Sequence, residues 1–286
     1  MSNAPYALEM PANRSSCVVF SSPHSGQHYP EALLQRSVLN RNVIRSSEDA
    51  FVDRLFAPAP EFGAPLLAAA MPRAYLDLNR SADELDPALI QGARRNGHNP
   101  RVASGLGVIP RVVANGRAIY RGKLTMDEAR LRIDTYWRPY HKRLKSLLAE
   151  SHRMFGQAIL IDCHSMPHEA VALAGNTKSK RPEIVLGDRF GASASGLIVD
   201  QIEAAFASAG LRVARNTPFA GAYVTQSYGR PARQQHAIQI EIDRALYMDE
   251  DTITPNAHFA EFKEVMRQVI SSIAGIGQEQ LPLAAE

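Results

Sequence analysis

The sequence predicts a single α/β domain spanning residues 1–286, with a mixed, mostly parallel β-sheet flanked by helices. Three observations support this fold class. Short apolar runs alternate with segments of helical periodicity along the chain, an order typical of sheets with helical crossovers. No linker, repeat or low-complexity stretch divides the 286 residues. Several apolar runs lead directly into loops that carry histidine or arginine, as expected where strands end at a ligand-binding edge.

Strand predictions rest on apolar runs and on alternation. Apolar runs predict buried strands at residues 18–20, 64–70, 158–166, 184–186 and 211–214. Apolar and polar residues alternate over residues 74–80, which predicts a strand ending at Arg80. In residues 236–243 isoleucines occupy every second position, so Glu241 lies on the opposite face of that strand.

Helical periodicity predicts helices at residues 45–56, 125–156, 197–209 and 255–273. Ser47 is the expected N-cap of the first helix. Thr125 and Glu128 form a capping box for the second. Pro139 is expected to kink that helix and Gly156 to end it.

The segment between residues 81 and 120 is irregular. Residues 81–107 show no periodicity and are predicted as a loop, and residues 108–120 as a hairpin that turns at Asn115-Gly116. No acid occurs between Asp86 and Asp127. The same interval contains Arg94, Arg95, Arg101, Arg111, Arg117 and Arg121. We interpret this basic excess either as a solvated face or as a funnel for an anionic substrate.

Composition places the chain among ordinary globular proteins. Hydrophobic residues make up 45% and charged residues 21% of the sequence, and no apolar run is long enough to span a bilayer, so no membrane partner is expected. The net charge of +3 and the scattered arginines disfavour nucleic acid as a partner. The first residues lack the pattern of a secretory signal, so we expect a cytoplasmic protein. Cys17 and Cys163 lie in apolar runs and are interpreted as reduced core residues. The oligomeric state stays open.

Four side chains that can carry chemistry lie at or just after predicted strand ends: His24, Arg80, His164 and Glu241. In open α/β sheets, ligands bind outside the carboxyl ends of the strands. We therefore expect the four side chains to meet in one crevice.

Two of these residues suggest a metal site. A hydrolytic zinc site needs three ligands from His, Asp or Glu and leaves a fourth position open. His24 and His164 supply two ligands, and Asp49 is the preferred third because it lies near the start of the first predicted helix. Glu48 is the rival, and the helix dipole alone also favours an acid in a first helical turn. His168 resembles the end of an H-x-x-x-H pair, but the proline before it favours a loop position.

Proton transfer and substrate binding need further groups. Zinc lowers the pKa of bound water from ~15.7 to roughly 7, and a carboxylate must still accept and redeliver the proton. Glu241 suits that role because an acid is costly to bury without a partner or a function; the alternative is a buried salt bridge, for instance with Arg244. Arg80 predicts a small-molecule substrate with a free carboxylate, because its planar guanidinium matches that group. The alternative is a structural pair with Asp77 or Asp83.

Other candidates concern the substrate pocket. The loop 220–230 is predicted to line the amino-acid side-chain pocket, with Gly221 giving it room to move and Tyr223 contacting substrate. Asn79 and Arg244 are further candidates for substrate contacts, although a structural role is preferred for Arg244.

Competing chemistries lack their motifs. The chain contains no G-x-S-x-G, no G-x-G-x-x-G and no phosphate-binding loop. Covalent catalysis by Cys163 is disfavoured because strand alternation points it away from Asp162 and His164. His141 lies on a predicted helix face and is interpreted as a core histidine.

Eight segments carry a resemblance to a known family. In chain order they are "SSPHSG", "EDAFVDRLF", "AYLDLNR", "RPYHKRL", "DCHSM", "VLGDRFG", "NTPFAGAYVTQSYGRP" and "IQIEIDRALYMDE". Together they resemble the N-formylglutamate amidohydrolase family. This resemblance implies the fold of zinc carboxypeptidases and aminoacylases, and zinc held by His24, an acid and His164. It also implies that Arg80 grips a substrate carboxylate and that Glu241 is the general base. The implied reaction is hydrolysis of N-formyl-L-glutamate to formate and glutamate, a late step of histidine breakdown.

One departure from the family leaves alternatives open. Members best known for this reaction resemble "TDWHV" where this chain has "EDAFV" at residues 48–52. The alignment supports Asp49 over Glu48, but the missing aromatic and histidine leave the acyl and side-chain preference open. A carboxypeptidase or a broader N-acyl-amino-acid hydrolase is one alternative. A catalytically inactive binding protein on the same fold is another.

Overall fold

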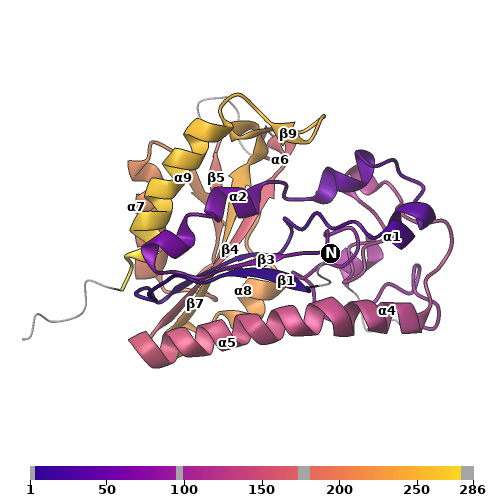
Figure 1. The fold of residues 1–286 in the computed structure, drawn as a ribbon, viewed down its shortest axis with the longest axis horizontal. Helices are drawn as coiled ribbons and strands as arrows, with labels where there is room; N and C mark the ends of the chain where they lie inside the picture. Colours follow the sequence, from indigo (N-terminus) through magenta and orange to yellow (C-terminus); the bar gives the residue numbers. More distant parts are fainter. Residues whose placement is uncertain (1–3, 95–98, 173–180, 278–286) are drawn as a thin grey trace, which may run out of the picture.

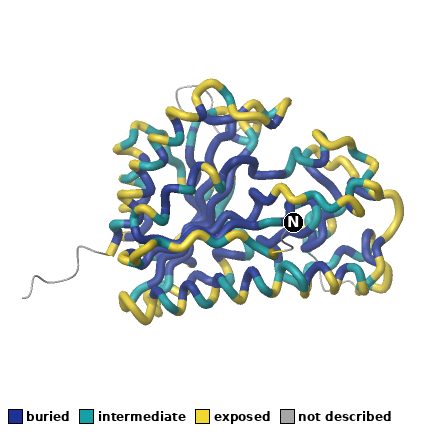
Figure 2. The backbone as a smooth tube through the Cα atoms, in the orientation of Figure 1, coloured by how far each residue is buried: buried dark blue, intermediate teal, exposed yellow. Residues whose placement is uncertain are grey.

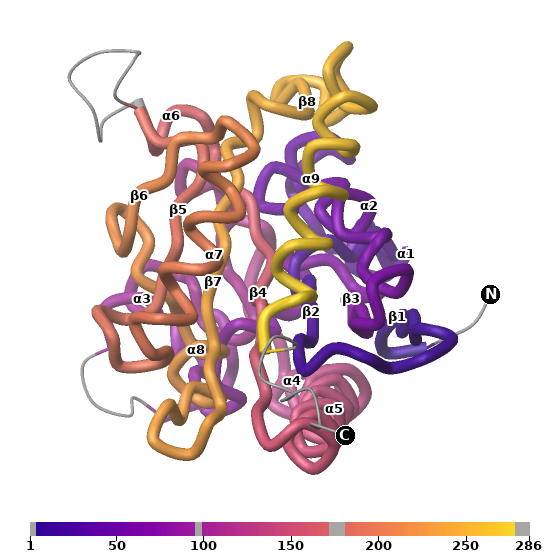
Figure 3. The backbone as a smooth tube through the Cα atoms, turned by 90° about the vertical axis from the view of Figure 1, so that its left-hand side faces the viewer, coloured from indigo at the N-terminus to yellow at the C-terminus, as the bar shows by residue number. Residues whose placement is uncertain are grey.

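The computed structural model describes residues 4–94, 99–172 and 181–277, which form one α/β domain around a seven-stranded sheet (Figure 1). In spatial order the strands are β1 (Tyr6–Glu9), β3 (Leu66–Ala69), β2 (Val18–Ser22), β4 (Ala158–Met166), β7 (Gln235–Asp243), β5 (Ile184–Gly187) and β6 (Val213–Arg215). Strands β3, β2, β4 and β7 are parallel, as are β5 and β6, whereas β1 and β5 run antiparallel to β3 and β7. The predicted mixed, mostly parallel sheet is therefore confirmed. Figure 3 shows β1 and β6 at opposite edges of the sheet.

Helices cover both faces of the sheet, and two hydrophobic clusters lie between the layers (Figure 1). One cluster includes residues of α2 (Val52–Phe56), α7 (Gly196–Ser208) and α9 (Phe259–Ala274); the other includes residues of α4 (Met126–Arg132), α5 (Arg138–Phe155) and α8 (Tyr223–Tyr228). Figure 2 shows the buried strands between partly exposed helices. Alternation along β4 feeds both clusters, because Ile159 and Ile161 enter the first and Leu160 enters the second.

The same alternation places polar groups at the carboxyl ends of the central strands. On the face of β4 that carries Leu160, the next two side chains are Asp162 and His164. Gln239 and Glu241 of β7 lie beside them in register, Gln239 next to Asp162 and Glu241 next to His164. The carboxyl-terminal parts of β4 and β7 therefore carry polar side chains on this face, whereas the residues before them are apolar.

The helix predicted over residues 45–56 is broken in the structure. A 3₁₀ helix, Val43–Ser47, is followed by extended backbone at Glu48, and α2 begins only after Phe51, whose φ is 65°. A residue with positive φ cannot continue a right-handed helix, so the helix starts anew after it. The prediction of Ser47 as N-cap is therefore wrong, and α2 has no side-chain cap.

The strand predicted over residues 74–80 is also wrong. Its apolar side chains lie in the second cluster, as the alternation predicts. The backbone forms turns instead, and the N–H groups of Tyr75 and Leu76 both donate to the Pro72 carbonyl. Alternation identified the side chains that join the hydrophobic cluster, although Asp77 and Asn79 are buried too, and no strand in the described ranges pairs with this backbone.

The long helical segment begins and ends at the predicted residues. Thr125 is the N-cap, and its side chain accepts a hydrogen bond from the Glu128 N–H. Gly156 ends α5 in the left-handed conformation. The irregularity that Pro139 predicts is a π-helical turn, Ile133–Trp137, between α4 and α5. The turn ends two residues before Pro139, which has no N–H to donate.

The irregular segment before that helix contains the predicted turn. Asn115 and Gly116 both have positive φ, and Val112 pairs with Ala118. The predicted loop is interrupted by α3 (Pro100–Ala103). The sequence did not predict β1, α1 (Glu31–Arg36), α6 (His168–Ala172), α8, or the ladder of β8 (Met248–Asp249) and β9 (Thr254–Pro255). No helix in the described ranges is long and apolar enough to cross a bilayer.

Candidate active site

A cavity of about 700 Å³ lies at the carboxyl ends of the central strands. His24, Arg80, His164 and Glu241, which the sequence predicts to meet, all line it. The other lining residues with charged or hydrogen-bonding side chains include Ser46, Ser47, Asp49, Arg73, Asn79, Arg101, Asn115, Ser165, Gln239 and Arg244. Sequence reasoning did not single out Arg73, because nothing distinguishes it from a surface arginine after an apolar run.

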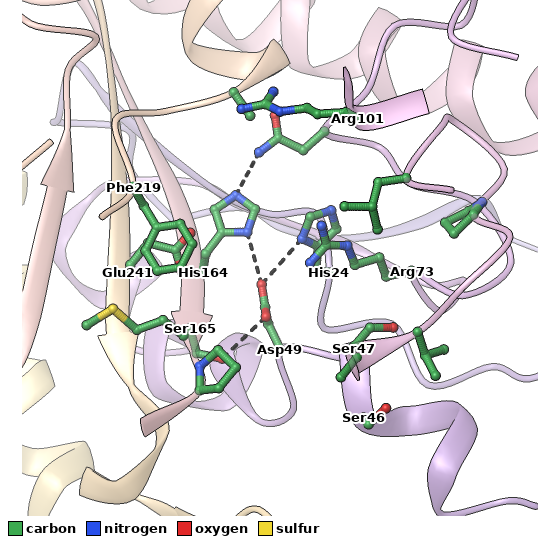
Figure 4. Close-up of a pocket in the computed structure, with 18 of the residues that line it drawn as sticks. His24, Ser46, Ser47, Asp49, Arg73, Arg101, His164, Ser165, Phe219 and Glu241 are labelled. Carbon is green, nitrogen blue, oxygen red and sulfur yellow. Dashed lines mark hydrogen bonds and ion pairs between the residues drawn. The ribbon is translucent and has the colours of Figure 1, made fainter. Parts of the chain in front are cut away.

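Three buried residues form a group that could hold a metal ion. One ligand atom from each of His24, Asp49 and His164 lies within 4.8 Å of the other two. His164 Nδ1 is 3.0 Å and His24 Nδ1 3.4 Å from Asp49 Oδ2, and Figure 4 shows both rings turned toward this carboxylate. His24 Nδ1 is buried and has no hydrogen-bond partner among the described residues. A buried nitrogen without a partner is costly, and a metal ion would satisfy it.

Two outer carboxylates hold the imidazole rings. Asp77 Oδ1 lies 2.7 Å from His24 Nε2, and Asp162 Oδ2 lies 2.9 Å from His164 Nε2. A proton on each Nε2, donated to its carboxylate, leaves both Nδ1 atoms free to bind an ion. Sequence reasoning missed both roles. Asp162 could have been found, because it lies two residues before His164 on the same strand face.

The geometry favours Asp49 over Glu48 as the acidic ligand. The Glu48 carboxylate accepts two hydrogen bonds from Arg45 and one from Tyr29, and does not belong to the group around the histidines. The Asp49 N–H donates to the His24 carbonyl at 3.0 Å, which ties two of the three segments together. The extended backbone after the 3₁₀ helix thus turns Asp49, and not its neighbour, toward the cavity.

Arg244 holds Asp49 from behind. Its Nη2 donates to Asp49 Oδ1 at 3.1 Å and to the Glu48 carbonyl, and its Nε donates to Ser165 Oγ. Its salt bridges go to Asp49 and Glu250. The alternative of a salt bridge between Glu241 and Arg244 is therefore not what the structure contains, and Arg244 positions a carboxylate of the candidate metal group.

Glu241 is a buried acid beside the candidate metal group. Gln239 Nε2 donates to its Oε1 at 2.8 Å, and it forms no salt bridge within the described residues. Burial raises the pKa of Glu241 to about 7, and the charge of Asp49 contributes in the same direction, against His164. A carboxyl group with such a pKa can exchange a proton near neutral pH.

Known proteins resemble this chain along most of its length. A sequence model of the family described as N-formylglutamate amidohydrolase matches residues 16–248. The chain belongs to this family. N-formylglutamate deformylases of Pseudomonas aeruginosa and Pseudomonas putida are 31% and 28% identical to it, over 92% of this chain and 94% of theirs. The crystal structure of N-formylglutamate amidohydrolase from Ralstonia eutropha JMP134 is 35% identical, with a TM-score of 0.89, over 96% of this chain and 99% of that chain.

Membership confirms the resemblance drawn from the sequence motifs, and the TM-score confirms the fold. The matched residues include every residue of the candidate metal group and Glu241. The chain is therefore a hydrolase of the N-formylglutamate amidohydrolase family with a buried site that could hold a metal ion.

Besides Arg244, three arginines of this family member line the cavity, and their partners differ. Arg73 Nε donates to Asp77 Oδ2 at 3.0 Å. Arg80 donates from Nε to the Leu106 carbonyl and from Nη1 to the Asn79 carbonyl. Since Asp77 bonds to Arg73 and to a histidine, the predicted alternative of an Arg80–Asp77 pair is not present. Of the basic excess named from the sequence, Arg101 lines the cavity.

The other described arginines between Asp86 and Asp127 do not line the cavity. Arg111 pairs with the buried Asp86 at 2.8 Å, and Arg94, Arg117 and Arg121 are exposed. Arg95 lies outside the described residues.

Not all residues that are predicted to contact substrate line the cavity. Asn79 lines the cavity, and its side chain connects Asp162, through Nδ2, with the Val224 N–H, through Oδ1. Gly221 also lines the cavity, with φ 104°, and a Cβ there would lie 2.5 Å from the Thr225 hydroxyl. A side chain at this position would therefore clash and strain the backbone. That Gly221 gives the loop room to move stays a prediction. Tyr223 lies at the start of α8, and its ring packs against Trp137 and His141.

Three further residues resolve questions left by the sequence. Ala50 and Phe51, which replace the family's aromatic and histidine, are buried in the first hydrophobic cluster and do not line the cavity. The loop position expected for His168 is wrong, because it begins α6; its Nδ1 lies 2.8 Å from Asp243. The preceding proline is compatible with a helix that starts after it.

Proposed function

We propose that this protein hydrolyses the formyl amide of N-formyl-L-glutamate, yielding formate and L-glutamate. The observation that carries the proposal is the position of Glu241 beside the His24–Asp49–His164 group in one cavity. Relatives matched over 92% of the chain are named N-formylglutamate deformylase, which supports this substrate. Location in the cytoplasm and a role in histidine breakdown stay predictions.

We assign zinc to the His24–Asp49–His164 group. Two imidazoles and a carboxylate are a donor set of catalytic zinc sites, which keep a fourth position open. The buried Nδ1 of His24 has no hydrogen-bond partner among the described residues and lies 3.4 Å from Asp49 Oδ2, which supports this assignment. When bound, zinc supplies a water of lowered pKa and polarises the substrate carbonyl. Asp77 and Asp162 orient the two imidazoles through their Nε2 atoms.

Glu241 is the proposed general base. Its carboxylate would accept a proton from the attacking water and deliver it to the departing amide nitrogen, so that no net proton is consumed at the residue. The pKa of about 7 suits both transfers at neutral pH. Gln239, which donates to Oε1, keeps the carboxylate oriented.

Arg80 and Arg73 are the proposed substrate-binding cations. Arg80 uses Nε and Nη1 for backbone carbonyls, and its guanidinium lines the cavity without a salt bridge among the described residues. We assign it to the α-carboxylate of the substrate. Arg73 is held through Nε by Asp77, and we assign it to the charge that develops on the amide carbonyl oxygen.

A hydrolysis screen tests the proposal. Purified chain supplied with zinc is incubated with N-formyl, N-acetyl and N-succinyl amino acids, and released formate and free amine are measured separately. We expect N-formyl-L-glutamate to give equal amounts of both, at the highest kcat/KM. A chain that binds zinc but cleaves none of these compounds would contradict the proposal.

A broader N-acyl-amino-acid hydrolase or a carboxypeptidase is the second candidate. The cavity of about 700 Å³ favours it, because pockets of this size accept ligands larger than a formyl amino acid. Faster release of amine from larger acyl groups or from dipeptides would select it. A chain that neither retains zinc nor gains activity from it would instead indicate a binding protein.

A further inference from the structure

Arg101 reaches the cavity from the side away from Asp49. It lies on α3, and Figure 4 shows it above His164, whereas Asp49 lies below that ring. Within the described ranges, no hydrogen bond or salt bridge engages its guanidinium, which lines the cavity. Arg73 and Arg244 differ in this respect, since each is bonded to an aspartate. Arg101 is therefore an exposed cation that lines the cavity and has no protein counter-charge among the described residues.

Leu106 links Arg101 to Arg80. Its N–H donates to the Arg101 carbonyl at 2.8 Å, and its carbonyl accepts from Arg80 Nε at 2.9 Å. Asn99 adds rigidity, because its Oδ1 caps α3 by accepting from the Arg101 N–H and its Nδ2 donates to Glu84. Both arginines are thus hydrogen-bonded to Leu106, and both line one cavity.

The two like charges influence each other. Burial, and to a lesser extent Arg73 and Arg101, lower the pKa of Arg80. Asp77 opposes this effect, and Glu84 does so more weakly. Cations that face one cavity repel each other, and an anion bound between them relieves the repulsion. A ligand with two carboxylates would supply one counter-charge to each arginine.

We propose that Arg101 is the specificity-determining residue of this site, binding the side-chain carboxylate of an acidic N-acyl amino acid while Arg80 binds the α-carboxylate. The inference rests on the proposed function for the identity of the reaction. A neutral side chain in the same place would leave Arg101 without an anionic partner, so the site discriminates by charge at the end of the substrate side chain.

The test compares substrates that differ by one charge. We would measure kcat/KM for N-formyl-L-glutamate and the near-isosteric N-formyl-L-glutamine with the zinc-loaded wild type, Arg101→Gln and Arg153→Gln. Arg153 is an exposed arginine on α5 outside the cavity lining and serves as the matched control. We expect the wild type to prefer the glutamate compound by roughly 10- to 100-fold, the value of one charged hydrogen-bonded pair. Arg101→Gln should remove the preference by slowing only the glutamate compound. Arg101→Lys should restore part of it, since the charge remains without the planar fork.

Two results would overturn the inference: a wild type without a preference, or an Arg101→Gln variant that slows both compounds equally. Calorimetric binding of L-glutamate and L-glutamine to the zinc-loaded chains separates this inference from the proposed function. If N-formyl amino acids are not cleaved but tighter glutamate binding disappears in Arg101→Gln, the proposed function fails and the inference holds. If the wild type binds both amino acids equally, the inference fails whatever the reaction.

Discussion

His164 and His141 are both 3% exposed, yet they lie in opposite electrostatic surroundings. His164 lies between two carboxylates, Asp49 at Nδ1 and Asp162 at Nε2. His141 lies between neutral groups, with Nδ1 2.7 Å from the Tyr228 hydroxyl and Nε2 2.9 Å from the Leu78 carbonyl. Adjacent residues contact the two rings. Leu78 contacts His141 through its carbonyl, and the next residue, Asn79, lies with Nδ2 3.1 Å from His164 Nε2.

The pKa of each ring follows its neighbours. Burial lowers the pKa of both rings, but Asp162 and Asp49 outweigh it and raise the pKa of His164 above its usual value. No acid opposes burial at His141, whose pKa falls to about 4. The comparison teaches that burial alone does not mark a functional histidine. Carboxylates on both nitrogens of a buried ring do, because they are costly to bury without a cation.

Replacing a candidate ligand should give the largest effect. We expect His164→Asn to lose the metal on dialysis and to lose activity with it, a larger loss than the about 100-fold effect of removing an outer partner. His236→Asn is the matched control, because His236 is buried on β7 and accepts a hydrogen bond from the Ser195 N–H, which asparagine can also accept. Metal content per chain is the measurement. Equal metal retention in both variants would remove His164 from the site.

Replacing the proposed base should slow turnover strongly but leave the metal in place. Glu241→Gln keeps the shape of the side chain and removes its ability to accept a proton, so we expect kcat to fall by about 10²- to 10⁴-fold. Metal content and the urea midpoint of unfolding should stay near wild type. A variant that unfolds easily, yet has unchanged activity per folded molecule, would show that Glu241 is structural.

Removing an outer carboxylate should have a smaller effect. Asp77→Asn takes the charge from His24 Nε2 but keeps an oxygen acceptor, and we expect metal affinity to fall by about 10- to 100-fold. Asp86→Asn removes another buried, arginine-paired aspartate outside the cavity lining and is the control. Competition with a chromogenic chelator measures both. Equal affinities in the two variants would contradict the positioning role of Asp77.

The neutral histidine should affect stability only in acid. Because the pKa of His141 is lowered in the folded protein, its contribution is fully present above the ordinary pKa of 6.5 and is lost as pH falls toward about 4. We expect this group to remove about 2 kcal/mol of the free energy of unfolding between pH 7 and pH 5. Urea unfolding of wild type and His141→Gln at both pH values measures the difference. An identical pH dependence in the two proteins would show that His141 does not titrate in this way.

The sequence was informative for features that follow from a local pattern of residues. Apolar runs located the central strands, and alternation placed Glu241 opposite the isoleucines of β7. Polar residues at strand ends located His24 and His164 at the cavity, since parallel strands bring their carboxyl ends to one edge. These inferences need only the period of a strand and the topology of a parallel sheet.

Other features depended on long-range packing. Alternation over residues 74–80 could not reveal that the backbone forms turns, because strand formation needs a partner and not only a pattern. The choice of Asp49 over Glu48 depends on the extended backbone at Glu48 and on Tyr29, which binds the Glu48 carboxylate from a distant segment. Neither is visible in a local pattern.

The sequence alone determined the fold class and identified His24, His164 and Glu241, because periodicity and strand ends are local properties of the chain. Tertiary structure alone assigns Asp77 to the His24 imidazole, and separates Arg101 from the arginines that are already paired. The physical reason is that charge pairing depends on distances of a few ångströms between segments far apart in the chain, and only the packed fold sets those distances.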